Sequence, residues 1–349
     1  MEKVQLNSLT YDELEVFFES IGEKKYRAQQ LFTFIHKNGG KDLKDLTTFS
    51  KKLRDKLNYI AEINRISILR RFDSKIDETK KYLFLLEDGN VIESVAMKYE
   101  HGYTICISTQ VGCRMGCKFC ASTKGGLIRN LYPSEMANQI YSIEEDLNIR
   151  ISNIVLMGSG EPLDNYENVI KFLHIIHHEK GHNISFRNIT LSTCGIVPRI
   201  YDLANEGIPV TLSISLHSPF DDIRQDIMPI AKRYSIKEII EACKYYYDKT
   251  RRRITIEYTL VEDVNDRDED LTELCKWLKD LNCHVNLIPL NPIKEFDRRR
   301  ANSKSIEKFS RVLNKKGIPT TIRREMGSDI NAACGQLRRR FMDNGSNLL

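Results

Sequence analysis

Three cysteines lie within eight residues of one another in the stretch VGCRMGCKFCAS, as Cys113, Cys117 and Cys120. Thiolates this close together on one loop can converge on a single metal centre. A four-cysteine zinc site usually draws on two CxxC pairs, and the sequence has no second pair. With only three protein ligands, a [4Fe–4S] cluster keeps one iron open to a substrate. A zinc site completed by a distant histidine is the alternative.

Small and polar residues follow several of the later apolar runs of the sequence. In GSGEP, the glycines let a ligand approach the backbone, and the carboxylate of the glutamate can accept from an ammonium group. The turns STCG and SISLHSP and the asparagine after HVNLIPL place further polar groups in equivalent positions. An ordinary turn or capping role is equally compatible with each of them alone. These residues are Gly158, Gly160, Glu161, Ser192, Ser215, His217 and Asn291.

From Thr104 onward, short apolar runs alternate with amphipathic segments that are long enough to form helices. Six βα repeats of this kind predict an α/β fold with a parallel sheet curved as a partial TIM-like (β/α)6 barrel. In such a sheet, reactive groups belong on loops at the carboxyl ends of the strands. The six predicted strands are TICIST, ISNIVLMG, NITLST, VTLSISLH, RITIEYTLV and HVNLIPL.

The residues before and after these repeats predict three further parts. Residues 1–62 are expected to form a small helical accessory domain, with Thr10 as an N-cap. Residues 63–100 are expected to form a β-rich extension, because the pair Asp88 and Gly89 favours a hairpin turn. The barrel core would then span residues 101–315, and residues 316–349 a C-terminal segment.

The composition is that of an ordinary globular protein, with 41% hydrophobic and 29% charged residues. No apolar stretch approaches the roughly 20 residues of a membrane helix, and the first residues lack the apolar core of a secretory signal, so a cytoplasmic protein is expected. Nine cysteines in such a chain favour metal or thiol chemistry over a disulfide framework. Arginine triplets at 251–253, 298–300 and 338–340 are compatible with a solvated surface or with a polyanionic partner.

The CxxxCxxC spacing resembles that of the radical S-adenosylmethionine (SAM) superfamily. The strings CISTQVGCRMGCKFCAS, RNLYPSE, MGSGEPLDNY, LSTCG, SLHSP, NLIPLNP and DINAACGQL together are similar to the RlmN/Cfr family of RNA adenine methyltransferases. This resemblance implies a radical SAM barrel whose cofactors are one [4Fe–4S] cluster and SAM, with SAM on the open iron. It implies packing roles for Cys194, Cys243, Cys275 and Cys283. The SAM contacts that it implies are Gly160, Glu161, Ser192, Ser215, Leu216, His217 and Asn291.

The resemblance also implies a mechanism, in which one SAM methylates the Cys334 thiolate. Reductive cleavage of a second SAM gives a radical that takes a hydrogen from this methyl group, and the resulting methylene adds to the adenine. Cys106 then attacks the Cys334 sulfur to release the RNA, leaving a disulfide that must be reduced. Glu93 lies where the family has the proposed proton acceptor; an exposed strand glutamate is the alternative.

By the same resemblance, the substrate is adenosine 2503 of 23S rRNA, methylated at C2, with adenosine 37 of some tRNAs as a second target. Methylation at C8, which gives antibiotic resistance, is the Cfr alternative; Pro162 favours C2, because Cfr sequences tend to have alanine there. A reducing system such as flavodoxin or ferredoxin and a monomeric chain are expected. Two other readings are an RNA-binding protein with a structural cluster and a different radical SAM reaction, such as peptide modification. Neither explains DINAACGQL.

Overall fold

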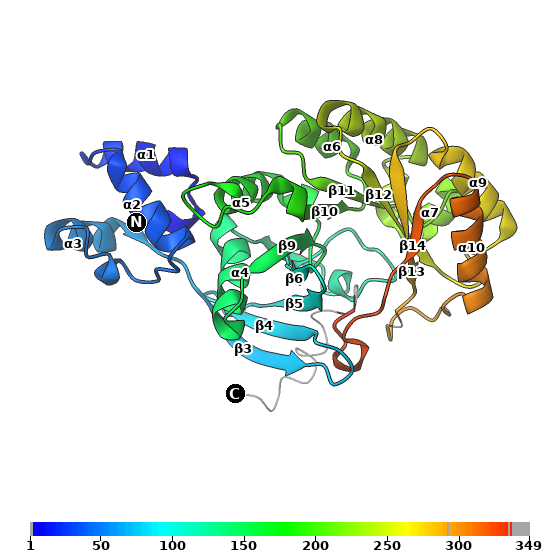
Figure 1. The fold of residues 1–349 in the computed structure, drawn as a ribbon, viewed down its shortest axis with the longest axis horizontal. Coiled ribbons are helices and arrows are strands. Elements are labelled where there is room, and N and C mark those ends of the chain that lie inside the picture. Colours follow the sequence, from blue (N-terminus) through cyan, green and yellow to red (C-terminus); the bar gives the residue numbers. More distant parts are fainter. Residues whose placement is uncertain (1–2, 292, 334–335, 337–349) are drawn as a thin grey trace.

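A ten-stranded sheet organises most of the chain (Figure 1). The computed structural model describes all residues except 1–2, 292, 334–335 and 337–349. Within this sheet, β6 and β9 to β14 are parallel, and β5, β4 and β3 continue the sheet as antiparallel strands. In spatial order the strands are β14 (Thr320–Ile322), β13 (Cys283–Pro289), β12 (Ile254–Leu260), β11 (Thr211–Ser215), β10 (Ile189–Thr193), β9 (Ile151–Leu156), β6 (Gly102–Cys106), β5 (Val91–Tyr99), β4 (Lys80–Leu86) and β3 (Ile66–Asp73).

Helices lie outside the curve of this sheet, so the parallel part is an incomplete barrel (Figure 1). All six strands predicted from the sequence are present, together with a short seventh, β14, that was not predicted. Three residues are too few to show a strand periodicity. The helices are α4 (Pro133–Leu147), α5 (Tyr166–His177), α6 (Val197–Asn205), α7 (Asp221–Ile227), α8 (Ile236–Thr250), α9 (Asp268–Leu278) and α10 (Ser303–Lys315).

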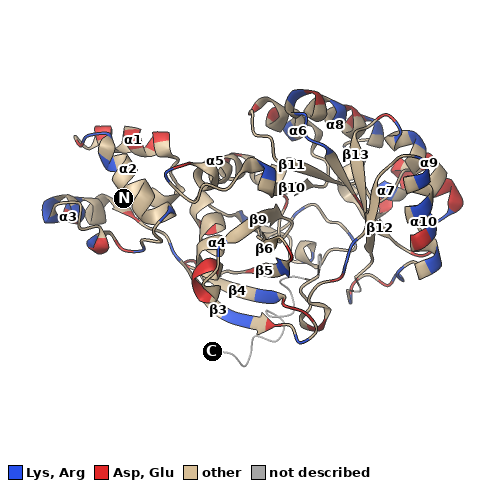
Figure 2. Cartoon of the chain, in the orientation of Figure 1, with Lys and Arg blue, Asp and Glu red and all other residues tan. Residues whose placement is uncertain are grey.

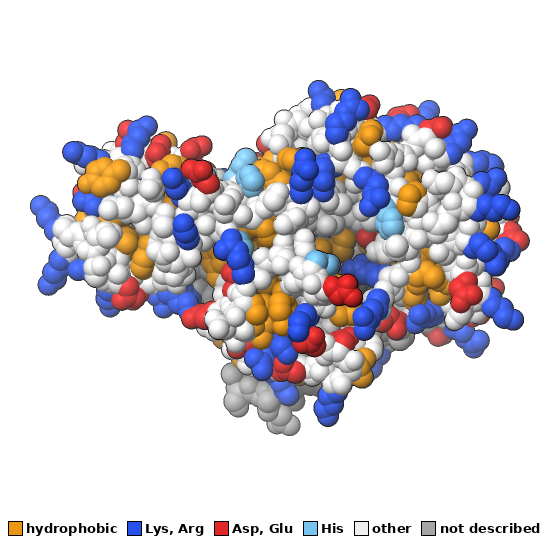
Figure 3. Space-filling view, viewed as in Figure 1, with side chains coloured by type: hydrophobic (Ala, Val, Ile, Leu, Met, Phe, Trp, Pro, Cys, Tyr) orange, Lys and Arg blue, Asp and Glu red, His pale blue; other side chains and the backbone are white. Residues whose placement is uncertain are grey.

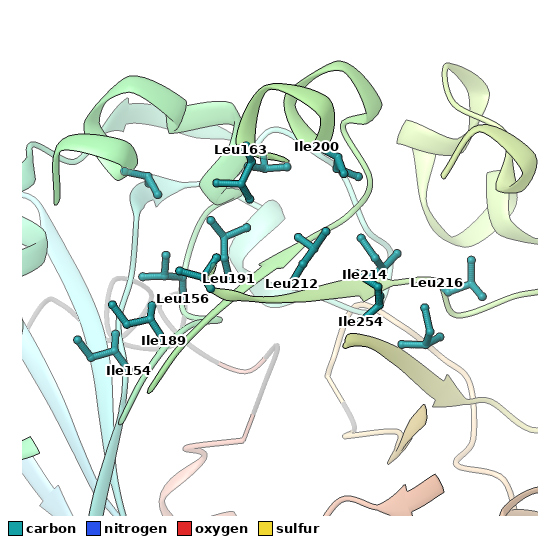
Figure 4. Close-up of a cluster of buried hydrophobic side chains, with 14 of the residues drawn as sticks. Ile154, Leu156, Leu163, Ile189, Leu191, Ile200, Leu212, Ile214, Leu216 and Ile254 are labelled. Atoms are coloured by element: carbon teal, nitrogen blue, oxygen red, sulfur yellow. The ribbon is translucent and has the colours of Figure 1, made fainter. Parts of the chain in front are cut away.

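The two faces of the sheet differ in chemistry. Leucine and isoleucine side chains of the strands point outward and pack against the helices, as Leu191 and Leu212 do with Leu163 and Ile200 (Figure 4). Each such buried side chain contributes about 1.5–3 kcal/mol to folding. The alternate positions carry polar residues such as Glu257 on the inner face, where they line a cavity. The barrel therefore keeps a polar interior for a ligand.

The N-terminal residues form a helical module with its own apolar core. Thr10 caps its first helix in a capping box with Glu13, as the sequence predicted for the N-cap. Ile175 of α5 joins this core, so the module packs against the barrel. Its helices are α1 (Tyr11–Ser20), α2 (Tyr26–His36) and α3 (Lys51–Ile60), and a two-stranded sheet, β1 (Val4–Gln5) with β2 (Ala61–Glu62), closes it.

The β-rich extension is continuous with the barrel sheet. β5 pairs with β6, and the hairpin between β4 and β5 turns at Gly89, whose φ is +81°. The turn predicted at Asp88 and Gly89 is therefore confirmed. Over the described part of the chain, no helix has the length and apolar character needed to cross a membrane.

His36 gives the junction between module and barrel a dependence on pH. Its ring is 2% exposed, and its Nδ1 lies 3.0 Å from the Tyr141 hydroxyl. Burial, and then the nearby His178, lower its pKa to about 3. The unfolded chain keeps a histidine pKa near 6.5, so below that pH the unfolded state binds a proton that the folded state excludes. Stability contributed by neutral His36 is therefore lost as the pH falls from about 6.5 towards 3.

We expect His36→Gln to flatten the pH dependence of stability. Between pH 6.5 and 5.5, the parent should lose about 1 kcal/mol more unfolding free energy than this variant. Urea unfolding midpoints at both pH values measure the difference. His101→Gln, at an exposed position, is the control and should keep the slope of the parent. Equal slopes for the parent and His36→Gln would show that His36 takes up no proton on unfolding.

Candidate functional site

The cysteine loop is an excursion between two short strands. β7 (Gln110–Gly112) and β8 (Leu127–Asn130) pair antiparallel, and the Cys113 N–H donates to the Gly126 carbonyl at 3.1 Å. The Thr123 hydroxyl donates to the carbonyls of Cys117 and Cys120, at 3.1 Å and 2.9 Å. The hairpin fixes both ends of the loop, and these bonds fix its middle.

The three cysteines line one cavity at the carboxyl ends of the parallel strands. Burial raises the pKa of Cys113 to about 12 and that of Cys117 well above its usual value. Thiols in such a place lose their protons when they bind a metal centre, because the positive charge of the metal takes the place of the proton. Within the described residues, no three histidine, cysteine or acidic side chains are close enough together to share a single ion. A cluster of several irons, in contrast, binds each thiolate at a different iron, so this donor set fits a [4Fe–4S] cluster.

Gly158 and Gly160 bring the loop after β9 against the segment that leads to the cysteines. A Cβ at Gly158 would lie 2.6 Å from the Ile107 carbonyl oxygen, and one at Gly160 would lie 2.7 Å from the Gln110 nitrogen. Gly160 also has a φ of +113°, which side chains of L residues rarely allow. The absence of a side chain at these two glycines therefore allows the two loops to pack closely together beside the cavity.

Glu161 links the loops after β9 and β10. Its carboxylate is 4% exposed and accepts the Leu163 N–H at 3.0 Å and the Cys194 N–H at 2.8 Å. Burial raises the pKa of this carboxyl group. The carboxylate also lines the cavity, where it can accept from a cationic group. The charge and place of Glu161 fit the ammonium group of SAM.

His217 lies at the end of β11, with its backbone in the left-handed region at a φ of +56°. Its Nδ1 accepts the Thr259 N–H at 2.9 Å, so the ring proton of the neutral form is on Nε2. Burial lowers its pKa to about 3, and the ring therefore stays neutral. It meets the Phe119 ring edge-on, with centroids 4.8 Å apart. His217 thus joins the strand end to the cysteine loop and offers a hydrogen-bond donor.

The cavity brings together most of the residues predicted to bind SAM or the cluster. Leu216 differs from the others, since its side chain is fully buried in the core. Cys194, assigned to packing, also lines the cavity. The predicted residues in its wall are Cys113, Cys117, Cys120, Gly160, Glu161, Ser192, Ser215, His217 and Asn291.

Sequence reasoning missed two charged residues of the inner face. Glu257 accepts the Ser213 hydroxyl and the Asn286 amide, both at 3.0 Å, and Arg323 lies 3.5 Å from its carboxylate. Both Glu257 and Arg323 line the cavity. A glutamate inside the apolar run ITIEYTL was a signal for an inner-face polar group. Arg323, on the segment that follows β14, had no such signal.

Arg224 was also missed, and it connects the ends of two strands behind the cavity. Its side chain is fully buried in α7 and donates to the carbonyls of Cys194 at 2.7 Å, Leu216 at 3.1 Å and Ser215 at 3.3 Å. Burial lowers the pKa of this guanidinium. Its partners are backbone carbonyls, which leave no trace in the sequence. Arg224 holds the ends of β10 and β11 in the places where their polar residues reach the cavity.

We expect Arg224→Met to lower the unfolding free energy by about 3 kcal/mol. The substitution leaves buried carbonyls without donors, at about 1–3 kcal/mol for each unsatisfied group. Arg233→Met, at an exposed position nearby, should change it by no more than about 0.5 kcal/mol. Chemical denaturation of the purified proteins measures both. A loss below 1 kcal/mol for Arg224→Met would show that the loops hold their positions without it.

A second, smaller cavity adjoins the first and contains Cys106. Its wall includes Ala332 and Ala333, and it shares Asn291 and Arg323 with the cysteine cavity. Cys334 lies outside the described residues, directly after Ala333. Among the described cysteines, none forms a disulfide. The part of the C-terminal segment that ends at Ala333 therefore lies beside Cys106.

Glu93 lies on the same face of the sheet as Cys106. Cys106 pairs with Val95 of β5, and Glu93 is two residues before Val95, so their side chains share a face. Glu93 is 4% exposed, and its carbonyl accepts the Ser108 hydroxyl at 2.7 Å. The alternative of an exposed strand glutamate is therefore wrong. Glu93 does not line either cavity described above.

Comparisons with known proteins agree with this geometry. Residues 107–275 match the model of the radical SAM superfamily, and residues 4–63 match that of the ribosomal RNA large subunit methyltransferase N-terminal domain. The chain is 56% identical to a probable dual-specificity RNA methyltransferase RlmN of Alkaliphilus oremlandii, over 99% of this chain and 100% of that one. A protein of the same name from Lachnoclostridium phytofermentans is 53% identical, over 98% and 96% of the two chains.

A solved structure is also similar over nearly its whole length. The crystal structure of a radical SAM methyltransferase from Sphaerobacter thermophilus superposes with a TM-score of 0.90 at 42% identity, and covers 96% of this chain and 99% of its own. The radical SAM assignment implies a [4Fe–4S] cluster and SAM as cofactors. Together with the near-complete match to RlmN proteins, it establishes that this chain belongs to the RlmN family of radical SAM methyltransferases.

Proposed function

We propose that this protein methylates C2 of adenosine 2503 in 23S rRNA, and adenosine 37 of some tRNAs, through an S-methylated Cys334. Its relatives carry the name dual-specificity RNA methyltransferase, which supports an RNA substrate. The observation that carries the proposal is the position of Cys106. It lines a cavity with Ala332 and Ala333, which precede Cys334, and this cavity adjoins the one with the three cluster cysteines.

The cofactor residues in the proposal are those of the larger cavity. Cys113, Cys117 and Cys120 hold the cluster, and Glu161 accepts from the amino group of SAM. When bound, the cluster and SAM supply a carbon radical that can remove a hydrogen from a methyl group. The neutral His217 ring donates from Nε2 to a SAM acceptor. Ser192, Ser215, Asn291 and the backbone of Gly160 and Leu216 complete the contacts.

The thiol residues carry the transfer itself. Cys334 accepts a methyl group from one SAM and presents it to the radical source. After the methylene has joined the adenine, a Glu93 carboxylate oxygen accepts the proton that leaves the ring. One electron of the adduct radical would return to the oxidised cluster. The Cys106 thiolate attacks the Cys334 sulfur, and the carbon–sulfur bond to the RNA breaks with its electron pair on the carbon, which takes up a proton to complete the methyl group. A Cys106–Cys334 disulfide remains for an external reductant. Both SAM molecules are thereby consumed in one turnover.

The remaining parts of the chain have supporting roles in the proposal. Residues 1–62 form an accessory domain that contacts RNA, residues 63–100 an extension, residues 101–315 the barrel core, and residues 316–349 the segment that carries Cys334. A reduced protein of the flavodoxin or ferredoxin type delivers the electron. The enzyme works as a monomer in the cytoplasm.

Nucleoside analysis tests this function. The protein, reconstituted anaerobically with iron and sulfide, is incubated with SAM, a reductant and a 23S rRNA fragment that contains adenosine 2503. We expect 2-methyladenosine in the digested RNA, detected by mass spectrometry. If 8-methyladenosine appears instead, the chain is a Cfr-type enzyme. If 5′-deoxyadenosine forms without any methylated nucleoside, RNA methylation at this target is the wrong function.

A further inference from the structure

The inner face of the sheet continues past Cys106 onto the antiparallel strands. Cys106 of β6 pairs with Val95, Val95 with Lys81, and Lys81 with Phe72 of the edge strand β3. Residues opposite one another in a sheet share a face, so this row runs from the thiol to the outer edge. Three strand spacings of about 4.8 Å put Phe72 roughly 15 Å from Cys106.

Cationic side chains surround the Phe72 ring. The Arg70 guanidinium carbon lies 4.6 Å from the ring centroid, and the Lys81 Nζ lies 5.0 Å from it. Arg70 is exposed and Phe72 is partly exposed. On these strands and their hairpin, Asp73 pairs with Lys80 at 2.8 Å and Glu78 with Lys98 at 2.7 Å. The Lys81 Nζ also donates to the Asn331 carbonyl at 3.4 Å. An aromatic ring between two cations thus lies on the same face as Cys106.

Charge alone does not locate an RNA surface on this molecule. Basic side chains are spread over the face in Figure 3 and are mixed with acidic ones. At least one arginine of each described triplet has a partner within the fold, since Arg252 donates to Thr211 at 2.8 Å and Arg300 pairs with Glu325 at 2.7 Å. The strands β3 and β4 carry basic residues at the edge of the sheet (Figure 2). What distinguishes this edge is the aromatic ring and its alignment with Cys106.

We propose that Arg70, Phe72 and Lys81 form a stacking platform for a nucleotide that flanks the target adenosine. This inference rests on the proposed RNA substrate. Unpaired bases stack on aromatic rings and on arginine guanidinium planes, and basic groups beside them contact the phosphates. A target base that leaves its stack to reach Cys106 also unstacks its neighbours, which then need a new partner. The platform provides that partner at the outer edge of the sheet, while Ile330 and Ala332 cover the same face around Val95 and Cys106.

Binding of RNA to the full-length reconstituted protein tests the platform. The probe is a fluorescent single-stranded oligonucleotide with the sequence around adenosine 2503, read by anisotropy without turnover. We expect Phe72→Ala to weaken binding about tenfold, as loss of one stacked base does, and Phe72→Trp to restore it. Arg70→Gln should lower the slope of log affinity against log salt by about 0.7. Arg71→Gln, on the opposite face of β3 and paired with Asp146, is the matched control and should leave the slope nearly unchanged.

Measuring probe binding and RNA methylation together distinguishes a failure of the platform from a failure of the proposed function. If Phe72→Ala binds the probe as tightly as the parent while the parent methylates RNA, the platform is wrong and the function stands. If the parent methylates no RNA but Phe72→Ala still loses binding, the surface binds RNA and the methylation proposal fails. Equal salt slopes for Arg70→Gln and Arg71→Gln would also overturn the platform. Formation of 5′-deoxyadenosine without RNA should be the same in all these variants, which confirms that each is folded.

Discussion

Cys106→Ala is expected to stop turnover after one RNA and to leave that RNA covalently attached to the enzyme. In the proposed sequence, the substrate is joined to Cys334 by a thioether, and the Cys106 thiol attacks that sulfur. Cys106 is 5% exposed in a cavity that it shares with Ala332 and Ala333. Removal of the thiol leaves the earlier steps intact, so the adduct accumulates. A denaturing gel with labelled RNA detects it as a slowly migrating species.

The matched control for this experiment is Cys243→Ala. Cys243 of α8 is fully buried in the core and lines neither cavity. Its replacement removes a thiol of similar burial and should keep multiple turnover. If Cys106→Ala turned over several RNA molecules without a cross-linked species, another group would release the product. A cross-link of equal yield in Cys243→Ala would show that the adduct forms independently of the Cys106 cavity.

Cys117→Ala is expected to lose most of the iron and all 5′-deoxyadenosine formation. The cluster has only three protein ligands in this account, because SAM occupies the fourth iron. Removal of one thiolate therefore leaves the cluster with only two protein ligands, and the site that binds SAM is disrupted as well. Cys117 is 9% exposed and belongs to a small apolar cluster, where water does not readily replace it. Iron analysis after anaerobic reconstitution, with the visible absorption of the cluster, measures the effect.

Cys194→Ala provides the control within the same cavity. Cys194 packs in the same apolar cluster as Cys117, and its backbone N–H and carbonyl already bind Glu161 and Arg224. Alanine keeps both backbone bonds, so this variant should retain its iron. Circular dichroism establishes that each variant is folded. A folded Cys194→Ala protein that lost as much iron as Cys117→Ala would show that the ligand set includes Cys194.

The sequence predicted those parts of the site that depend on local patterns. The three cysteines are close in the chain, and the strands that carry Ser192 and Ser215 have a clear alternation of apolar and polar residues. The period of two also explains Leu216, whose side chain falls on the core side while its neighbours Ser215 and His217 face the cavity. Patterns within a few residues are sufficient for such predictions.

Contacts between distant segments were outside the reach of the sequence. Arg224 acts through carbonyls of β10 and β11 that any residue could supply, and Arg323 meets Glu257 from a segment 66 positions away. The continuity of β3, β4 and β5 with the barrel sheet likewise depends on strand pairing and not on local composition. This continuity places Glu93 and Phe72 on the same face of the sheet as Cys106, although both residues belong to earlier strands in the sequence.

The central claim is that Cys334 carries the methyl group on its way to the RNA. Mass spectrometry of the peptide that contains Cys334, from protein purified from cells and not exposed to reductive turnover, tests this most directly. The account predicts one added methyl group on the Cys334 sulfur and none on Cys106. An unmodified Cys334 in protein that still methylates its RNA would contradict it.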